Sequence, residues 1–312
     1  MSCVRPRVWR DGSGSTLDGR APSLLCGPGA ASARRRSAAR ASWAFWGPLK
    51  QIGLFTATRW EQRAVRRVMT VEARRRIAAR ICLVGSRAGH RLFVFRTGVG
   101  PVHAAAACRQ VLDAQPLDLV ISAGFACALT PARIGDLLIG TDIIAWGGKM
   151  DPPNVQRSLA CQPAAAAAAI EAGRAVGLTT CAGRIVSVPR VLWRAEDKRR
   201  VAEATGAIAA DMESAALGAA AAERGIGVAV IRTVSDVLDE DLPLDFNLFL
   251  EEPRRVAQAV AGLVRPKALA GLLRLGMQSR LASVYLTQGV ARFLDGLDRR
   301  ATSPARATGA RR

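Results

Sequence analysis

Residues 119–124 read Leu-Val-Ile-Ser-Ala-Gly, a short apolar run that is typical of a strand buried on both faces of a sheet. Comparable strand patterns occur at 52–57, 91–97, 136–145, 184–188 and 227–232. Helical patterns lie at 60–79, 101–112, 164–176, 195–204 and 212–224. Buried strands that alternate with helices predict an α/β protein, a three-layer α/β/α sandwich around a central mixed, mostly parallel sheet.

The composition changes along the chain and predicts four segments. Residues 1–45 are rich in Arg, Ala and Ser and are expected to form a disordered extension, although a transit peptide or a later start of translation would also fit them. Residues 50–265 are expected to form the folded domain, 266–298 amphipathic helices, and 299–312 a basic disordered tail. No uninterrupted apolar stretch reaches about 18 residues, so no membrane-spanning helix is predicted.

The chain carries 45 Lys and Arg residues against 25 acidic ones, a formal net charge of +20. The first 45 residues contribute six of these charges and the last fourteen contribute five, so the folded part is only mildly basic. The basic runs lack interleaved aromatic residues, and no specific nucleic-acid interface is predicted. Seven cysteines without a Cys-x-x-Cys pair, and only two histidines, favour a reducing, cytoplasmic location without a metal site.

Four polar motifs have the composition of functional sites. Gly98 and Gly100 join a predicted strand to a helix, which suits either a tight turn or a loop that approaches a ligand closely. Asp-Met-Glu at 211–213 opens a helical run, where acids either stabilise the helix start or face a ligand. Ser-Asp at 235–236 ends an apolar strand, where parallel sheets place ligands, and Glu61 follows the first strand. Each motif alone is equally well explained as a cap, a turn or a surface residue.

Together, these motifs resemble those of the purine nucleoside phosphorylase and nucleosidase superfamily. Residues 52–250 are similar to 5'-methylthioadenosine/S-adenosylhomocysteine nucleosidases and to hopanoid-associated phosphorylases. Four stretches in the same order carry the resemblance: Ile52-Gly53 with Glu61; Thr97-Gly98-Val99-Gly100; Ser122-Ala123-Gly124 with Ile134-Gly135-Asp136; and Asp211-Met212-Glu213 with Arg232-Thr233-Val234-Ser235-Asp236. The resemblance implies a nucleoside phosphorylase-like fold, cleavage of the N-glycosidic bond of a purine nucleoside with adenine as the expected base, and no metal or organic cofactor.

The resemblance also assigns roles to individual residues. Asp236, held by Ser235, would donate a proton to N7 of the purine, which is general acid catalysis of base departure. Glu61 would activate the attacking water, and Glu213 would bind the ribose hydroxyls with Met212 on the sugar face. The other implied substrate-binding residues are Asp211, Gly98, Gly100, Ser187, Val191 and Arg232, the last of which would also support the loop of Asp236.

Two departures from the family pattern bear on the nucleophile and the base. Residues 56–61 lack the Gly-Asp-Pro phosphate loop typical of phosphorylases, which favours water as the nucleophile. Arg59 and Arg87 could nevertheless bind an anion, so phosphorolysis remains the alternative, as of adenosylhopane in hopanoid biosynthesis. Val191 stands where nucleosidases have an aromatic residue against the base, which leaves the preference for adenine open.

The expected partners also follow from the resemblance. Relatives are commonly dimers, and a homo-oligomer is expected here. The C-terminal helices are predicted either to cover a sheet edge or oligomer contact, or to approach a membrane surface through an Arg-decorated face. A nucleoside-binding protein without catalysis is the alternative from another class, and the joint presence of Glu61, Glu213 and Asp236 argues against it.

Overall fold

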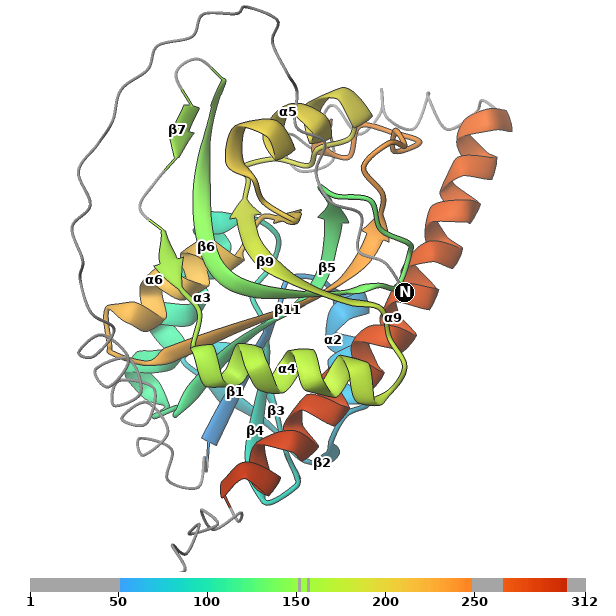
Figure 1. Cartoon of the computed structure of the whole chain (residues 1–312). Coiled ribbons are helices and arrows are strands. Elements are labelled where there is room, and N and C mark those ends of the chain that lie inside the picture. Colours follow the sequence, from blue (N-terminus) through green and yellow to red (C-terminus); the bar gives the residue numbers. More distant parts are fainter. Residues whose placement is uncertain (1–50, 151–152, 156–157, 249–265, 302–312) are drawn as a thin grey trace, which may run out of the picture. The chain divides into compact units, whose positions relative to one another are not determined.

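The computed structural model describes residues 51–150, 153–155, 158–248 and 266–301, and Figure 1 shows how their helices and strands are arranged. The N-terminal extension predicted at 1–45 lies outside the described residues. Of the predicted basic tail, only the first three residues are described, and they end the last helix. Among the described residues, no helix has both the length and the apolar character needed to cross a membrane.

Five strands form a closed ring. β5 (Leu119–Ala128) pairs in parallel with β11 (Gly227–Asp236), and β11 pairs antiparallel with β6 (Leu137–Met150). β6 pairs in parallel with β9 (Thr180–Ser187), and the short strand β10 (Ala209–Asp211) closes the ring because it pairs with both β9 and β5. The predicted three-layer sandwich did not include this closure, in which the sheet curls until β10 meets β5.

The sheet continues on the other side of β5. The further strands are β1 (Gln51–Thr56), β4 (His90–Arg96), β3 (Arg80–Arg87) and β2 (Thr70–Ile77), with β7 (Pro153–Val155) and β8 (Leu159–Ala160) beside β6. Within the described ranges, five strand pairings are parallel and six are antiparallel. The mixed sheet is confirmed, and the parallel pairings, although one fewer, join the longer central strands β1, β4, β5, β6, β9 and β11.

The segment 60–79, predicted as one helix, divides into two different elements. α2 (Arg59–Arg66) ends early, and the chain then continues as β2, which pairs antiparallel with β3. Every side chain of β2 is exposed or half-buried, and its alternation of apolar and polar residues stops at Ala73, after which three arginines follow. Its arginines gave the segment the charge pattern of a surface helix instead.

Helices cover both faces of β1, β5 and β11. α3 (Pro101–Ala114) and α6 (Ser214–Ala222) pack together on one face, and α2, α4 (Pro163–Ala175) and α9 (Pro266–Ala301) pack on the other. Alternate residues of β5 point into these two cores, as the two-residue period of a strand requires. The predicted helical layers are thus present around these strands, and their apolar contacts hold the sheet that carries the site.

The carboxyl ends of three ring strands point toward one helix. Figure 1 shows the arrowheads of β5, β9 and β11 directed toward α5 (Ala195–Thr205). Val201 of α5 packs with Ile144, Val186 and Ala210 in a third, smaller core. This core fixes α5 beside the strand ends where the functional side chains gather.

α9 is one continuous helix where several helices were predicted. Its inner face buries Leu286, Val290 and Phe293 against the domain. Its outer face exposes large apolar side chains at intervals of three or four residues: Leu269, Leu273, Met277, Leu281 and Val284. The helix therefore has two apolar faces. No described residue covers the outer one.

Candidate active site

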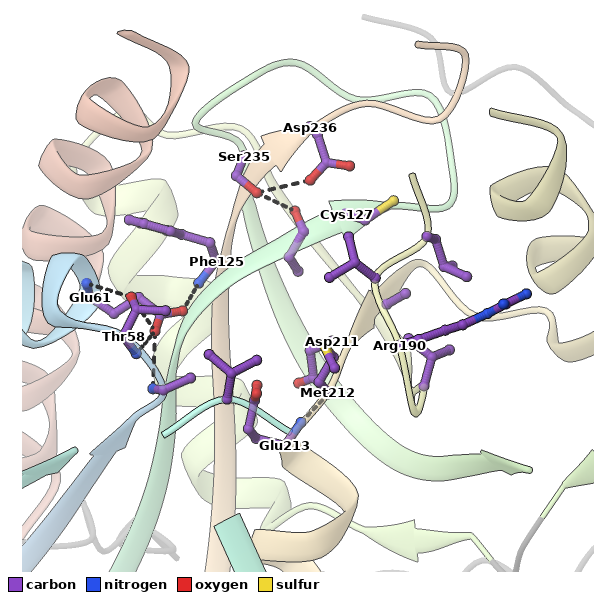
Figure 2. Close-up of a pocket in the computed structure, with 17 residues that line it drawn as sticks. Thr58, Glu61, Phe125, Cys127, Arg190, Asp211, Met212, Glu213, Ser235 and Asp236 are labelled. Atoms are coloured by element: carbon purple, nitrogen blue, oxygen red, sulfur yellow. Dashed lines mark hydrogen bonds between the residues drawn. The ribbon is translucent and has the colours of Figure 1, made fainter. Parts of the chain in front are cut away.

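A pocket lies at the carboxyl ends of β5, β10 and β11, with about 590 Å³ of empty space that is partly open to solvent. Figure 2 shows the side chains of Glu61, Glu213 and Asp236 on three sides of this pocket. The fold thus brings together three acids that are far apart in the sequence. Its wall also includes the apolar residues Val99, Phe125, Val191 and Leu192, the exposed Arg190, and Met212.

Glu61 is fixed at the start of α2. Its Oε2 accepts hydrogen bonds from the backbone N–H groups of Ala57 (3.0 Å) and Thr58 (2.7 Å) and from Thr58 Oγ1 (2.9 Å). Because Thr58 Oγ1 also accepts from Glu61 N, the two residues form a capping box. Oε1 accepts from Phe125 N of β5 at 2.8 Å, so the buried carboxylate joins the helix start to the central strand.

Asp236 ends β11, and its side chain is 14% exposed toward the pocket. Ser235 Oγ donates to Asp236 Oδ2 at 3.0 Å, in agreement with the predicted contact. Lys198 Nζ lies 2.8 Å from Oδ1 as an ion pair, without the alignment of a hydrogen bond. The carboxyl group is thus held at both oxygens from the protein side.

Cys127 lies beside Asp236 in the wall of the pocket (Figure 2). Burial raises the pKa of the Cys127 thiol well above its ordinary value, and the charge of Asp236 adds to the rise. The thiol is therefore neutral at ordinary pH, since deprotonation would place a buried negative charge next to the carboxyl group of Asp236.

The predicted glycine loop supports Glu213. Gly98 and Gly100 both have positive φ angles, +89° and +94°, which glycine adopts without the strain of a side chain. Gly100 N donates to Glu213 Oε1 at 2.8 Å, and Val99 between the glycines lines the pocket. The loop therefore fixes the carboxyl group expected to bind the sugar.

Glu213 is buried at the start of α6, and burial raises its pKa from 4.5 to about 8. The carboxylates of Asp211 and Glu61 add to this rise, while Arg232 opposes it. Below that pH, the protonated form of Glu213 predominates. A protonated carboxyl group can donate one hydrogen bond and accept others, which suits a pair of sugar hydroxyls.

The carboxylate of Asp211 is engaged within the protein. Its Oδ1 accepts from Ser187 Oγ at 2.5 Å and from the N–H groups of Glu213 and Ser214 at 3.2 Å each. Ser187 Oγ in turn accepts from Ala215 N. Both side chains were predicted to bind substrate. Asp211 does line the pocket, and the contacts of both side chains also fix the start of α6.

Arg232 also has a different place from the one that the resemblance implies. It is buried, and its Nη2 lies 2.7 Å from Asp211 Oδ2 and 2.7 Å from Ser122 Oγ. The guanidinium group thus pairs with Asp211 and does not support the loop of Asp236. Because both charges are buried, each requires the other, and the pair stabilises the wall behind Glu213.

One wall of the pocket is formed by the loop that follows β9. Val191 lines the pocket, and its backbone N–H and C=O bind the side-chain amide of Asn247 at 2.7 and 2.9 Å. Met212, predicted to lie on the sugar face, also lines the pocket. The loop expected to meet the base is therefore anchored to residue 247, which the sequence analysis did not single out.

Neither arginine considered as an anion ligand faces this pocket. Arg87 forms a two-pronged ion pair with Asp295, at 2.8 and 2.9 Å, and donates to Val68 O. Arg59 lies on the exposed surface of α2. Among the described residues that line the pocket, Arg190 is the one cation.

Two contacts of the site could not be anticipated from the motifs. Phe125 contributes a backbone N–H to Glu61, and a backbone group leaves no trace in the sequence. Lys198 lies in a run of charged residues that resembles an exposed helix face. Its one signal is compositional, because only four of the 45 basic residues are lysines.

The sequence of this chain is similar to those of known proteins. The family model described as "Phosphorylase superfamily" matches residues 51–266. A 5'-methylthioadenosine/S-adenosylhomocysteine nucleosidase of Geobacillus kaustophilus is 30% identical over 178 residues, 52% of this chain and 74% of the relative. The nucleosidase of Shewanella sp. (strain W3-18-1) is 28% identical over 221 residues, 64% of this chain and 91% of the relative.

Solved structures of similar fold include a nucleosidase and a futalosine hydrolase. The nucleosidase of Neisseria meningitidis, in complex with methylthio-immucillin-A, has a TM-score of 0.63 and 22% identity, covering 79% of this chain and 99% of its own. Futalosine hydrolase of Helicobacter pylori has a TM-score of 0.60 and 18% identity, covering 78% and 97%. At these identities the likeness is one of fold.

Proposed function

This chain belongs to the phosphorylase superfamily, and from that premise we propose that it hydrolyses the N-glycosidic bond of a purine nucleoside. One observation carries the proposal: Glu61, Glu213 and Asp236 line a single pocket. The names of similar proteins, which are nucleosidases and a futalosine hydrolase, support cleavage of this class of bond.

In the proposed reaction, Asp236 protonates N7 of the purine while the bond between C1' and N9 breaks. The electron pair of that bond moves into the base, and the sugar passes through an oxocarbenium-like state, as in glycoside hydrolysis. Glu61 takes a proton from the water that attacks C1', and Glu213 holds the ribose hydroxyls. The products are the free purine and the free sugar.

The charges around the pocket favour water over phosphate. Because Glu213 is protonated below about pH 8 and Asp211 is paired with Arg232, Glu61 gives this group of side chains its net negative charge, which disfavours a phosphate dianion. Arg87 is already paired with Asp295, and Arg190 alone supplies positive charge to the described lining. We therefore prefer hydrolysis to phosphorolysis.

The identity of the substrate is tested directly. The purified full-length chain is incubated with adenosine, methylthioadenosine and adenosylhopane, with and without inorganic phosphate, and both products are identified. Release of adenine and free sugar without phosphate supports the proposal. A sugar 1-phosphate formed only with phosphate would establish phosphorolysis, and tight binding of every nucleoside without base release would establish a binding protein.

We also propose that a second copy of the chain covers the outer face of α9. Its exposed Leu269, Leu273, Met277 and Leu281 form an apolar stripe of the kind that marks an interface. Light scattering should give a dimer that Leu273→Ser weakens. A monomer that instead sediments with anionic vesicles would favour the predicted membrane contact.

A further inference from the structure

Lys198 is a buried cation next to the proposed acid. It projects from α5, and its side chain is 0% exposed. Its ammonium group donates to the backbone oxygens of Val237 (2.9 Å) and Glu240 (2.8 Å), the loop that directly follows Asp236. Because burying an ammonium group is costly unless it is paired, these contacts define one position for it.

The third contact of Lys198 is to the carboxyl group itself. Its Nζ lies 2.8 Å from Asp236 Oδ1, an oxygen that makes no hydrogen bond with the described residues. Ser235 donates to the other oxygen. The two contacts with backbone oxygens would be enough to anchor the loop. The short distance between Lys198 Nζ and Asp236 Oδ1 therefore needs a different explanation.

The other groups near Asp236 do not supply a positive charge. The neighbouring Cys127 is a neutral thiol because its pKa is raised. Arg190, the cation among the described lining residues, is exposed, and in Figure 2 its side chain extends away from Asp236. The ammonium group of Lys198 is thus placed to compensate charge on Asp236.

We infer that Lys198 is a positioning residue for the proton transfer, an inference that rests on the proposed function. When the proton of Asp236 moves to N7 and the C1'–N9 bond breaks, a carboxylate remains at Asp236. The fixed ammonium stabilises this developing negative charge at the moment it appears, without reorganisation of solvent. Lys198 itself neither gains nor loses a proton.

The inference predicts a dependence on the leaving group. Methylthioadenosine requires protonation at N7, whereas its N7-methylated derivative already carries a fixed positive charge there. Lys198→Met should lower kcat for methylthioadenosine by about 10- to 100-fold with little change in KM. Turnover of the N7-methylated substrate should be unchanged, and Lys198→Arg, which keeps the charge, should recover part of the loss.

Arg199→Met is the matched control. Arg199 lies on the same helix and pairs with Asp239 of the same loop at 2.8 Å, but this pair is exposed and does not reach Asp236. The control should behave as wild type with both substrates. Thermal unfolding of each variant separates a loss of fold from a loss of chemistry.

Several outcomes would overturn the inference. If Lys198→Met slows both substrates equally, the residue only supports the structure. If it slows neither, or if Arg199→Met has the same effect, the contact with Oδ1 has no special role. In these cases wild type still cleaves the nucleoside, so the proposed function survives; a wild-type chain that releases no base removes both proposals.

Discussion

The two ends of the pocket hold the same chemical group in different ways. At one end, Glu61 accepts four hydrogen bonds, all from uncharged donors. At the other end, Asp236 accepts one hydrogen bond from Ser235 and lies against the ammonium group of Lys198. Neutral donors make all the hydrogen bonds to Glu61, and the buried Arg232 acts on it only through its electrostatic field, whereas Asp236 lies in direct contact with a cation. The proposed roles of base and acid thus fall on carboxyl groups that have different partners.

The largest effect is expected at the acid end. Asp236→Asn removes the transferable proton, and kcat for methylthioadenosine should fall by about 10³-fold. Steady-state measurement of adenine release tests this, with Asp239→Asn as the control because Asp239 is an exposed residue of the same loop. If Asp236→Asn retained full turnover, Asp236 would not be the acid, and the proposed difference between the two ends of the pocket would be wrong.

A smaller loss of activity is expected at the base end. Glu61→Gln places an amide where a carboxylate accepts several N–H groups, and kcat should fall by roughly 10²-fold. Unpaired donors in this buried site should also lower the free energy of unfolding by about 1–3 kcal/mol. Activity and urea unfolding measure the two effects, and Glu72→Gln on exposed β2 is the control. Wild-type behaviour in both assays would contradict the role of Glu61.

The smallest effect on turnover is expected at Glu213, between the two ends, where the measured quantity is instead the pH dependence of stability. Its pKa is about 8 in the folded protein and near 4.5 in the unfolded chain, so between these values the folded state retains a proton that the unfolded state releases. The free energy of unfolding should therefore decrease as pH rises through this window, by at most about 1.4 kcal/mol per pH unit. Urea unfolding from pH 5 to 9 should show a flatter dependence for Glu213→Gln. Equal slopes would mean that Glu213 does not set this dependence.

The sequence predicted those parts of the fold in which burial leaves a pattern. The apolar runs of β1, β4, β5 and β11 were identified because strands buried on both faces are continuously hydrophobic. β2 was missed because its side chains are solvated, and β10 because three residues are too few to show any period. The closure of the ring depends on β10 and could not be foreseen.

The same limit applies to the site. The acids 61, 213 and 236 were found from motifs, and one pocket contains all three. Asp211 and Arg232 occur in the same motifs, but their charges neutralise each other inside the protein. Sequence alone cannot distinguish a charged side chain that faces a ligand from one that faces another side chain. To make that distinction, one must know which residue the side chain contacts, and Asp211 and Arg232 are 21 positions apart in the sequence.

The strand that closes the ring also has a consequence for how the chain folds. β10 pairs with β5, about 80 positions earlier in the sequence, and leads directly into Met212 and Glu213. Contacts between such distant segments form late, because the entropy of the intervening loop must be lost first. A refolding chain that has formed only its local contacts would therefore still lack the wall of the pocket that carries Glu213. Formation of the pocket would report these long-range pairings rather than the first appearance of secondary structure.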